Sequence, residues 1–325
     1  MPQSEVIICV LTYNRPAFLA QALRSILAQT WRDLRVVILD NASTTDYAPV
    51  IAEFQDERVA YVRHEKNLGS TGNLAHACQH FMTAPFFMAF HDDDLMHPEL
   101  IERQVRQLQA QPRICWVSCL LQAFQGEPSA FESKLTNAVM FFDSRAELAE
   151  ALMCGLQLNF GAVLYRSSAL RKVDLQLLID QCSIIADRPI LFHAMRHGGA
   201  AILIDRLLLY REHLTQDSWT GYLRPRHLIG LAQQYQSALD EAPTLLRRWR
   251  FRFWCALNLP ASYFRLPPPV QSAFWPFVRQ CRESGVLHRS LLVWFPVRQA
   301  LGYIVRKLLR RGSTAPVIIR RREET

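Results

Sequence analysis

The sequence predicts an α/β protein whose mostly parallel sheet is covered by helices on both faces. Along its N-terminal third, four apolar β-prone segments alternate with segments of helical periodicity. Each apolar segment ends in a polar cluster, and such buried, continuous apolar strands are typical of parallel sheets. Ligands of open α/β sheets bind beyond the carboxyl ends of the strands, so the same pattern predicts a nucleotide-binding site at that edge.

The predicted strands follow from continuous apolar runs, and the predicted helices from apolar residues that recur on one helical face. The strands comprise residues 6–11, 36–40, 59–63, 86–91, 114–121, 159–165, 201–204 and 207–210. A helix is expected to begin at Pro16, because proline is favoured in a first turn. Further helices are expected after Pro98 and over residues 187–197, whereas residues 125–140 predict a loop that could cover a cleft.

Three adjacent carboxylates, Asp92, Asp93 and Asp94, follow the apolar run of residues 86–91. Burying three acids costs free energy unless a cation or hydrogen bonds compensate, and a divalent metal would do so. If the backbone stays extended, Asp92 and Asp94 point the same way and Asp93 points the opposite way. The alternative is a solvated acidic turn at the N-terminus of the helix that Pro98 begins.

Composition places the chain among folded proteins, because half of its 325 residues are apolar. The net charge of +8 is unevenly distributed. From Leu245 onward there are 16 Lys and Arg against 3 Asp and Glu, a net charge of +13, whereas residues 1–244 carry −5. A basic tail on an acidic body indicates an anionic partner, either a membrane or a nucleic acid.

Several function classes lack their signatures in this sequence. No Gly-x-Gly-x-x-Gly follows the first predicted strand and no Gly-Lys-Ser or Gly-Lys-Thr phosphate loop is present, which disfavours a dinucleotide oxidoreductase. The 8 cysteines form no Cys-x-x-Cys pair and favour reduced, buried thiols over a disulfide framework or a zinc site. With no basic leader and no apolar stretch of about 20 residues, the expected location is the cytosol.

Five motifs, in order, resemble those of the inverting glycosyltransferases of family 2. They are Thr12-Tyr13-Asn14-Arg15, Asp40-Asn41-Ala42-Ser43, Asn67-Leu68-Gly69 with Gly72-Asn73, Asp92-Asp93-Asp94 and Tyr210-Arg211-Glu212-His213. The resemblance covers residues from about 6 to 215. It implies a GT-A fold, with a Rossmann-like nucleotide-binding arrangement. The expected catalytic domain is residues 1–225, with a nucleotide-sugar-binding half at 1–115 and an acceptor-binding half at 116–225.

The resemblance also implies roles for single residues. Asp94 would hold a Mg²⁺ or Mn²⁺ ion, with His213 as a second ligand or a contact to the diphosphate. Asp92 would contact the ribose. Such an ion, held by oxygen ligands, neutralises the charge that grows on the leaving diphosphate.

In the same family, the residue matching Asp40 hydrogen-bonds the base, usually uracil. Thr12, Tyr13 and Arg15 would close around the nucleoside. Gly72 would let the backbone approach the ligand, and Asn73 would help to orient it.

Inversion requires a base that takes the proton from the attacking acceptor hydroxyl. The family places this carboxylate in a Glu-Asp pair at the start of a helix, and the matching residues here are Ala186 and Asp187. Asp187 is therefore the candidate base, although the Glu is replaced. The alternative is that Asp187 serves as an N-cap, with Pro189 just inside the helix.

The C-terminal region, residues 226–325, predicts a basic, aromatic-rich helical region. Between Trp294 and Leu309 apolar residues share one helical face and basic residues flank it, which is typical of a helix lying on an anionic membrane surface. The alternative is a helical subdomain that packs on the catalytic domain. A nucleic-acid partner is not favoured, because no nucleic-acid-binding module is recognised.

Together these features predict an enzyme that transfers a sugar, with inversion, from a UDP- or dTDP-linked donor to a glycan or lipid-linked acceptor in cell-surface polysaccharide synthesis. Its expected location is the cytoplasm, peripherally at the membrane. One alternative is a catalytically inactive scaffold of the same fold that binds nucleotide or glycan at the membrane, which the replacement at Ala186 favours. A sugar nucleotidylyltransferase is a further alternative, but its glycine-rich N-terminal signature is missing.

Overall fold

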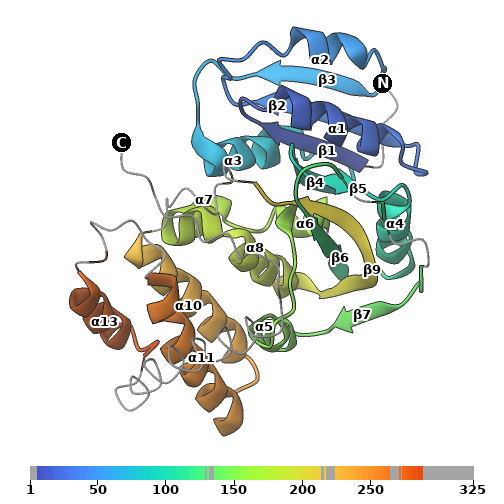
Figure 1. Cartoon of the computed structure of the whole chain (residues 1–325). Coiled ribbons are helices and arrows are strands. Elements are labelled where there is room, and N and C mark those ends of the chain that lie inside the picture. The colour runs from blue at the N-terminus through green and yellow to red at the C-terminus, as the bar shows by residue number, and fades with distance from the viewer. Residues whose placement is uncertain are drawn as a thin grey trace, which may run out of the picture.

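The strands pair into one mixed, nine-stranded sheet with the order β3-β2-β1-β4-β8-β6-β9-β5, and β7 pairs with β9 (Figure 1). The computed structural model describes residues 6–128, 130–131, 135–213, 216, 224–263, 271 and 273–287. Helices flank the sheet, so the α/β class predicted from the alternating pattern is confirmed.

The strands are β1 Val6–Thr12, β2 Leu34–Asp40, β3 Val59–Arg63, β4 Phe86–His91, β5 Leu95–Met96, β6 Ile114–Phe124, β7 Val139–Phe142, β8 Leu164–Arg166 and β9 Gly199–Arg211. The α-helices are α1 Pro16–Leu27, α2 Ala48–Glu53, α3 Gly69–Phe81, α4 Leu100–Ala110, α5 Arg145–Met153, α6 Ser167–Leu170, α7 Leu175–Cys182, α8 Asp187–Ala194, α10 Pro225–Leu239, α11 Leu245–Tyr263 and α13 Phe274–Glu283. Three 3-10 turns are η1 Phe160–Ala162, η2 Ser183–Ile185 and η3 Met195–His197.

The first four strands of the sheet run parallel and bring their carboxyl ends together. β1 pairs with β2 and β4, and β2 pairs with β3. In this register Thr12 lies opposite Asp40, and Leu11 lies opposite His91. The polar clusters that follow β1, β2 and β4 therefore meet at one edge of the sheet, as the apolar runs predicted.

Alternating side chains of β1 enter two different apolar cores. Val6, Ile8 and Val10 pack with the buried face of α1, whereas Ile7 and Cys9 pack on the opposite side of the sheet with residues of α3. This double burial explains why β1 is apolar throughout rather than alternating. All 8 cysteines are unpaired, and 7 of them are buried, as expected for thiols inside apolar segments.

Two predictions for the second half of the chain are wrong. Residues 160–162 form the turn η1, because the side chain of Asn159 caps it by accepting a hydrogen bond from the Gly161 backbone N–H at 2.6 Å. Only β8 of the expected strand is therefore extended. The two expected short strands are one strand, β9. Asp205 in its middle accepts hydrogen bonds from the backbone N–H groups of Thr136 and Asn137, which lets this polar residue lie within the sheet.

Helices α10, α11 and α13 lie at the opposite end of the molecule from α2 and β3 (Figure 1). They share a continuous apolar core with the sheet, and Tyr235 of α10 packs edge-on against Phe192 of α8 at 5.1 Å between ring centroids. The helical character expected after residue 226 is present here, while the boundary at residue 225 stays a prediction. The expected amphipathic helix at 294–309 lies outside the described residues. Within the described residues, no helix is long and apolar enough to span a bilayer.

Candidate active site

The three acids occupy a buried turn directly after β4. The strand ends at His91, so the backbone is not extended across Asp92, Asp93 and Asp94. One nitrogen of Arg15, Nη1, lies 3.2 Å from Asp92 Oδ1 and 3.1 Å from Asp93 Oδ2. The alternation expected of an extended chain therefore does not apply. The alternative of a solvated acidic turn is also wrong, because all three acids are buried.

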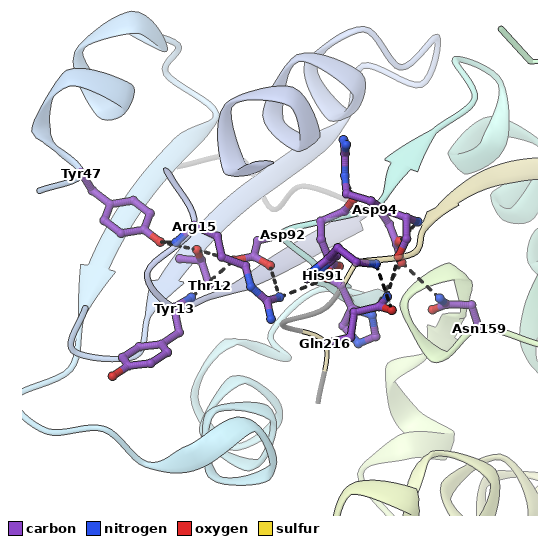
Figure 2. Close-up of polar contacts among 12 residues, drawn as sticks. Thr12, Tyr13, Arg15, Tyr47, His91, Asp92, Asp94, Asn159 and Gln216 are labelled. Carbon is purple, nitrogen blue, oxygen red and sulfur yellow. Dashed lines mark hydrogen bonds and ion pairs between the residues drawn. The ribbon is translucent and has the colours of Figure 1, made fainter. Parts of the chain in front are cut away.

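Asp92 is held by Thr12, the last residue of β1, and by the residues that follow it (Figure 2). The Thr12 hydroxyl donates to Asp92 Oδ2 at 2.7 Å, and Thr12 Oγ1 lies 2.8 Å from the hydroxyl of Tyr47. That hydroxyl accepts from the backbone N–H of Arg15 at 2.8 Å. The side chain of Tyr13 is 42% exposed, and its ring is turned away from the acids. Thr12 and Arg15 thus lie beside Asp92, as the resemblance implied.

Asp94 is held from the other side of the site. Its Oδ1 accepts from the backbone N–H of Arg211 at 3.0 Å, and its Oδ2 accepts from Asn159 Nδ2 at 3.1 Å. The Arg211 side chain donates from Nε to the carbonyl oxygen of Asp93 at 2.9 Å. The guanidinium lies between two rings, 4.4 Å from the centroid of Phe18 and 4.6 Å from that of Phe124. The end of β9 therefore fixes the acidic turn by hydrogen bonds and cation–π contacts.

Two histidines contact the acids. His213 Nε2 lies 2.8 Å from Asp93 Oδ2, and His91 Nδ1 lies 3.7 Å from Asp94 Oδ2. One ligand atom from each of His91, Asp93 and Asp94 lies within 4.8 Å of the others. Carboxylate oxygens and imidazole nitrogens are ligands of divalent metals, and this concentration of buried acids needs positive charge nearby, so the residues fit a divalent cation.

Burial and mutual charge set the protonation of the cluster. Burial and the neighbouring Asp93 carboxylate raise the pKa of Asp92 to about 6. Burial also opposes ionisation of Asp93, but the hydrogen bond with His213 and nearby positive charges hold the pKa of Asp93 below its ordinary value. Burial disfavours protonation of His91, yet Asp94 and the two other carboxylates raise the pKa of His91 to about 9.

Asp40, the expected base-binding residue, is buried at the end of β2. Its Oδ1 accepts from the backbone N–H of Ser43 at 2.9 Å, and its Oδ2 accepts from the Tyr61 hydroxyl at 2.6 Å. Arg63 Nε lies 3.4 Å from Oδ2. A carboxylate offers about four lone-pair sites, so Asp40 retains capacity for another donor. Its role toward a base stays a prediction.

An open hollow of about 840 Å³ lies beside Asp40, between α2 and β3, and its lining includes Tyr47, Tyr61 and Arg63. Tyr47 contacts Thr12 and Tyr61 contacts Asp40, so the hollow adjoins the site on the side away from the acidic turn. The volume falls in the range of pockets that bind small ligands.

Gly72 and Asn73 lie in α3 and serve the packing of the protein itself. A Cβ atom at Gly72 would lie 2.9 Å from Leu68 Cβ, so the missing side chain is needed for this contact. Asn73 is buried, donates from Nδ2 to the carbonyl oxygen of Leu39 at 3.1 Å, and has Oδ1 2.9 Å from His64 Nε2. Both groups of this amide have partners inside the protein. Ligand contacts for Gly72 and Asn73 stay predictions.

Asp187 is the first residue of α8, and the N-cap position is taken by Ala186. The interpretation of Asp187 as an N-cap is therefore wrong, since no side-chain cap hydrogen bond forms at this helix. Burial raises the pKa of the Asp187 carboxyl, although the charge of Arg188 partly offsets it. The charge of His91 also partly offsets the rise of the Asp187 pKa.

Three further contact residues were not foreseen from the sequence. Tyr47, Asn159 and His91 each come from a segment outside the motif that they contact. Of these three residues, only His91 could have been identified from the sequence, because it ends an otherwise apolar strand directly before the acids. No sequence pattern marked Tyr47 or Asn159 as contact residues, since single polar residues in loops are common.

Comparisons with known proteins also identify glycosyltransferase family 2, the family that the sequence motifs resemble. The family described as Glycosyl transferase family 2 matches residues 7–166. An uncharacterised glycosyltransferase of Nostoc sp. is 26% identical over 218 residues, covering 64% of this chain and 65% of that protein. A Campylobacter jejuni GalNAc(5)-diNAcBac-PP-undecaprenol beta-1,3-glucosyltransferase is 32% identical over 97 residues, 29% of this chain and 30% of that protein.

Among solved structures, S. aureus TarS in complex with UDP-GlcNAc superposes with a TM-score of 0.65 at 13% identity, covering 96% of this chain and 93% of TarS. At this identity the likeness shows the fold alone. The family match ends before Asp187 and His213, so the roles of these two residues are not part of it. Residues 7–166 therefore form a glycosyltransferase family 2 domain, and the chain has the GT-A fold.

Proposed function

We propose that the protein transfers a sugar, with inversion, from a UDP- or dTDP-linked donor to a glycan or lipid-linked acceptor. The observation that carries the proposal is the buried turn of Asp92, Asp93 and Asp94, held between the end of β1 and the end of β9. This turn lies at the edge where open α/β sheets bind nucleotides.

On the donor side, Asp92 accepts hydrogen bonds from the ribose hydroxyls. Arg15 and Thr12 hold the Asp92 carboxylate in place. The base lies toward Asp40, next to the hollow that Tyr47 and Tyr61 line. Tyr13, whose ring is exposed, closes over the nucleoside. The nearness of Thr12, Arg15 and Asp92 supports this placement.

The ion is Mg²⁺ or Mn²⁺, held by Asp94 with the neighbouring Asp93, and His213 is the candidate for a further ligand or a diphosphate contact. When bound, the ion neutralises the negative charge that develops on the leaving diphosphate. The fit of buried carboxylates and imidazole to a divalent cation supports this part of the proposal.

On the acceptor side, Asp187 takes the proton from the attacking hydroxyl. A carboxyl with a raised pKa is a better proton acceptor than an ordinary aspartate, because the ideal catalytic pKa lies near the working pH. Its position as the first residue of α8, at the start of a helix as the resemblance implied, supports the role. The replacement of the family's preceding Glu by Ala186 leaves Asp187 as the one carboxylate of that pair.

The name of a relative supports a lipid-linked acceptor. The C. jejuni relative is named for an undecaprenol-linked acceptor, and a lipid-linked acceptor requires the enzyme to reach a membrane. The first turn of α11 exposes Leu245 (87%), Leu246 (63%) and Trp249 (56%) beside Arg248. Exposed aliphatic and indole groups next to cations are typical of surfaces that lie on anionic bilayers.

We therefore infer a peripheral position on the cytoplasmic face of the membrane, in the synthesis of a cell-surface glycan. The unpaired cysteines agree with a reducing compartment. The net charge of +13 from Leu245 onward adds an electrostatic attraction to anionic lipid.

The test is a transfer assay with UDP- and dTDP-linked sugars, Mg²⁺ or Mn²⁺, and undecaprenyl-diphosphate-linked saccharides. NMR of the product reports the anomeric configuration. The proposal expects an inverted linkage from the wild type and transfer slowed by about 10²-fold or more in Asp187→Asn. A folded wild type that binds nucleotide yet transfers no sugar to any acceptor would favour the scaffold instead.

A further inference from the structure

His91 directly precedes the three acids in the sequence. It ends β4, and the alternation of a strand places it on the same face as Phe87 and Ala89, both of which are buried in the core beneath α3. The His91 side chain is 39% exposed and lies next to the fully buried Asp94.

The ligand atoms around His91 are close enough for one ion. His91 Nδ1 lies 3.7 Å from Asp94 Oδ2, and the chosen atoms of His91, Asp93 and Asp94 all lie within 4.8 Å of one another. Ligands sit about 2.1 Å from a small divalent ion, so neighbouring donors around one ion are about 3 to 4 Å apart. Small side-chain movements bring all three atoms into that range.

The turn η1 supports this arrangement. Asn159 is buried, donates from Nδ2 to Asp94 Oδ2 at 3.1 Å and accepts from the Gly161 backbone N–H at 2.6 Å. A Cβ atom at Gly161 would lie 3.3 Å from His91 Nδ1 and 3.0 Å from Asn159 Oδ1. The same turn thus fixes the Asp94 carboxylate and leaves space for the imidazole ring.

We propose that His91 is a nitrogen ligand of the divalent cation, together with oxygens of Asp93 and Asp94. This inference rests on the proposed metal-dependent function and adds one ligand to the proposed metal site. Because imidazole binds Mn²⁺ and later transition metals better than it binds Mg²⁺, His91 makes the site prefer Mn²⁺ over Mg²⁺. Asn159 and Gly161 are positioning residues that act through Asp94 and His91.

The test measures metal binding to the full-length protein directly. Mn²⁺ is titrated into metal-free protein by electron paramagnetic resonance, and Mg²⁺ competition gives the preference between the ions. His91→Gln is expected to weaken Mn²⁺ binding by about tenfold or more and to reduce the Mn²⁺-over-Mg²⁺ preference. The matched control is His80→Gln, which changes an exposed histidine at the far end of α3. It is expected to leave the Mn²⁺ affinity and the preference for Mn²⁺ over Mg²⁺ unchanged.

Nitrogen coordination is read separately by spin-echo modulation from imidazole ¹⁴N. His213→Gln removes the other histidine near the acids, so a nitrogen signal that persists in this variant and disappears in the His91→Gln/His213→Gln double variant assigns it to His91. Gly161→Ala, which crowds His91 without removing a ligand, is a second variant in case His91→Gln does not fold, and it too weakens Mn²⁺ binding.

The outcomes separate this inference from the proposed function. Mn²⁺ bound with the same affinity and the same nitrogen signal in His91→Gln as in the wild type overturns the role of His91 and leaves the metal-dependent transferase intact. A wild type that binds no divalent ion, with or without UDP, overturns both.

Discussion

The backbone N–H of Arg211 donates a hydrogen bond to Asp94 Oδ1 at 3.0 Å across 117 residues of sequence. The same residue donates from Nε to the carbonyl oxygen of Asp93 at 2.9 Å. Because both bonds come from one residue at the end of β9, the acidic turn is fixed by the sheet itself. Hydrogen bonds within the protein therefore position the acidic turn, and such preorganisation favours tight binding.

Arg211→Met is expected to destabilise the fold. It removes two side-chain hydrogen bonds to backbone carbonyls and two cation–π contacts, with an expected loss of about 2 to 4 kcal/mol in the free energy of unfolding. Urea unfolding followed by circular dichroism measures it. Arg106→Met, which removes an exposed pair with Glu102, is the control and is expected to change stability by less than about 1 kcal/mol. Equal effects of the two substitutions would contradict the structural role of Arg211.

Asp187→Asn tests the assignment of the base. The amide cannot accept a proton, so kcat is expected to fall by about 10² to 10⁴ while the affinity for UDP stays the same. Asp174→Asn is the matched control. Asp174 caps α7 by accepting from the Leu177 backbone N–H at 3.0 Å, and asparagine caps equally well. Retention of wild-type kcat in Asp187→Asn would exclude this carboxyl as the base.

The pH dependence of transfer follows from the raised pKa of Asp187. The base works only when ionised, so kcat/KM is expected to fall as pH drops through a pKa above the ordinary value of about 3.9 for aspartate. Protonation of Asp92, whose pKa is about 6, would also weaken donor binding over an overlapping range. UDP binding measured over the same pH series separates the two effects, because protonation of Asp92 would weaken UDP binding whereas protonation of Asp187 would not. An acid limb at or below about pH 4 would contradict the raised pKa.

The exposed first turn of α11 is expected to bind anionic membranes. The double variant Leu245→Glu/Trp249→Glu should lower binding to phosphatidylglycerol vesicles by at least about tenfold, because each buried apolar side chain contributes about 1.5 to 3 kcal/mol. Leu177→Glu, at an exposed leucine of α7, is the control for adding a negative charge elsewhere. Sedimentation with vesicles measures the bound fraction. Undiminished sedimentation of the double variant would place the membrane contact, if one exists, on another surface.

The sequence predicts those parts of the site that depend on local pattern. Thr12, Asp40 and Asp92 each follow an apolar strand, and parallel pairing of β1 with β2 and β4 is enough to bring their ends together. These predictions hold because strand period and strand direction are properties of short segments. The apolar run before the acids allowed either a buried site or a solvated turn, and the structure shows that the acids are buried.

The partners of the acids depend on distant segments and could not be predicted. Tyr47 reaches Thr12 from the loop before α2, and Asn159 reaches Asp94 across 65 residues. The orientation of Asp93 was also missed, because the strand ends at His91 and the alternation rule applies only to an extended backbone. Asn73 differs from these residues because the sequence motif predicted a ligand contact for it. In the structure, the oxygen and the nitrogen of its amide are both hydrogen-bonded within the protein.

The most direct test of the metal-dependent donor site is calorimetric titration of UDP, and of dTDP, into the wild type and into Asp94→Ala, each with and without Mn²⁺. Asp205→Ala removes another buried aspartate far from the proposed nucleotide site and controls for general loss of structure, which circular dichroism monitors. We expect the wild type to bind nucleotide more tightly with Mn²⁺ than without it, and Asp94→Ala to lose this difference. Nucleotide binding that is identical with and without Mn²⁺ in both proteins, or no binding by a folded wild type, would contradict this expectation.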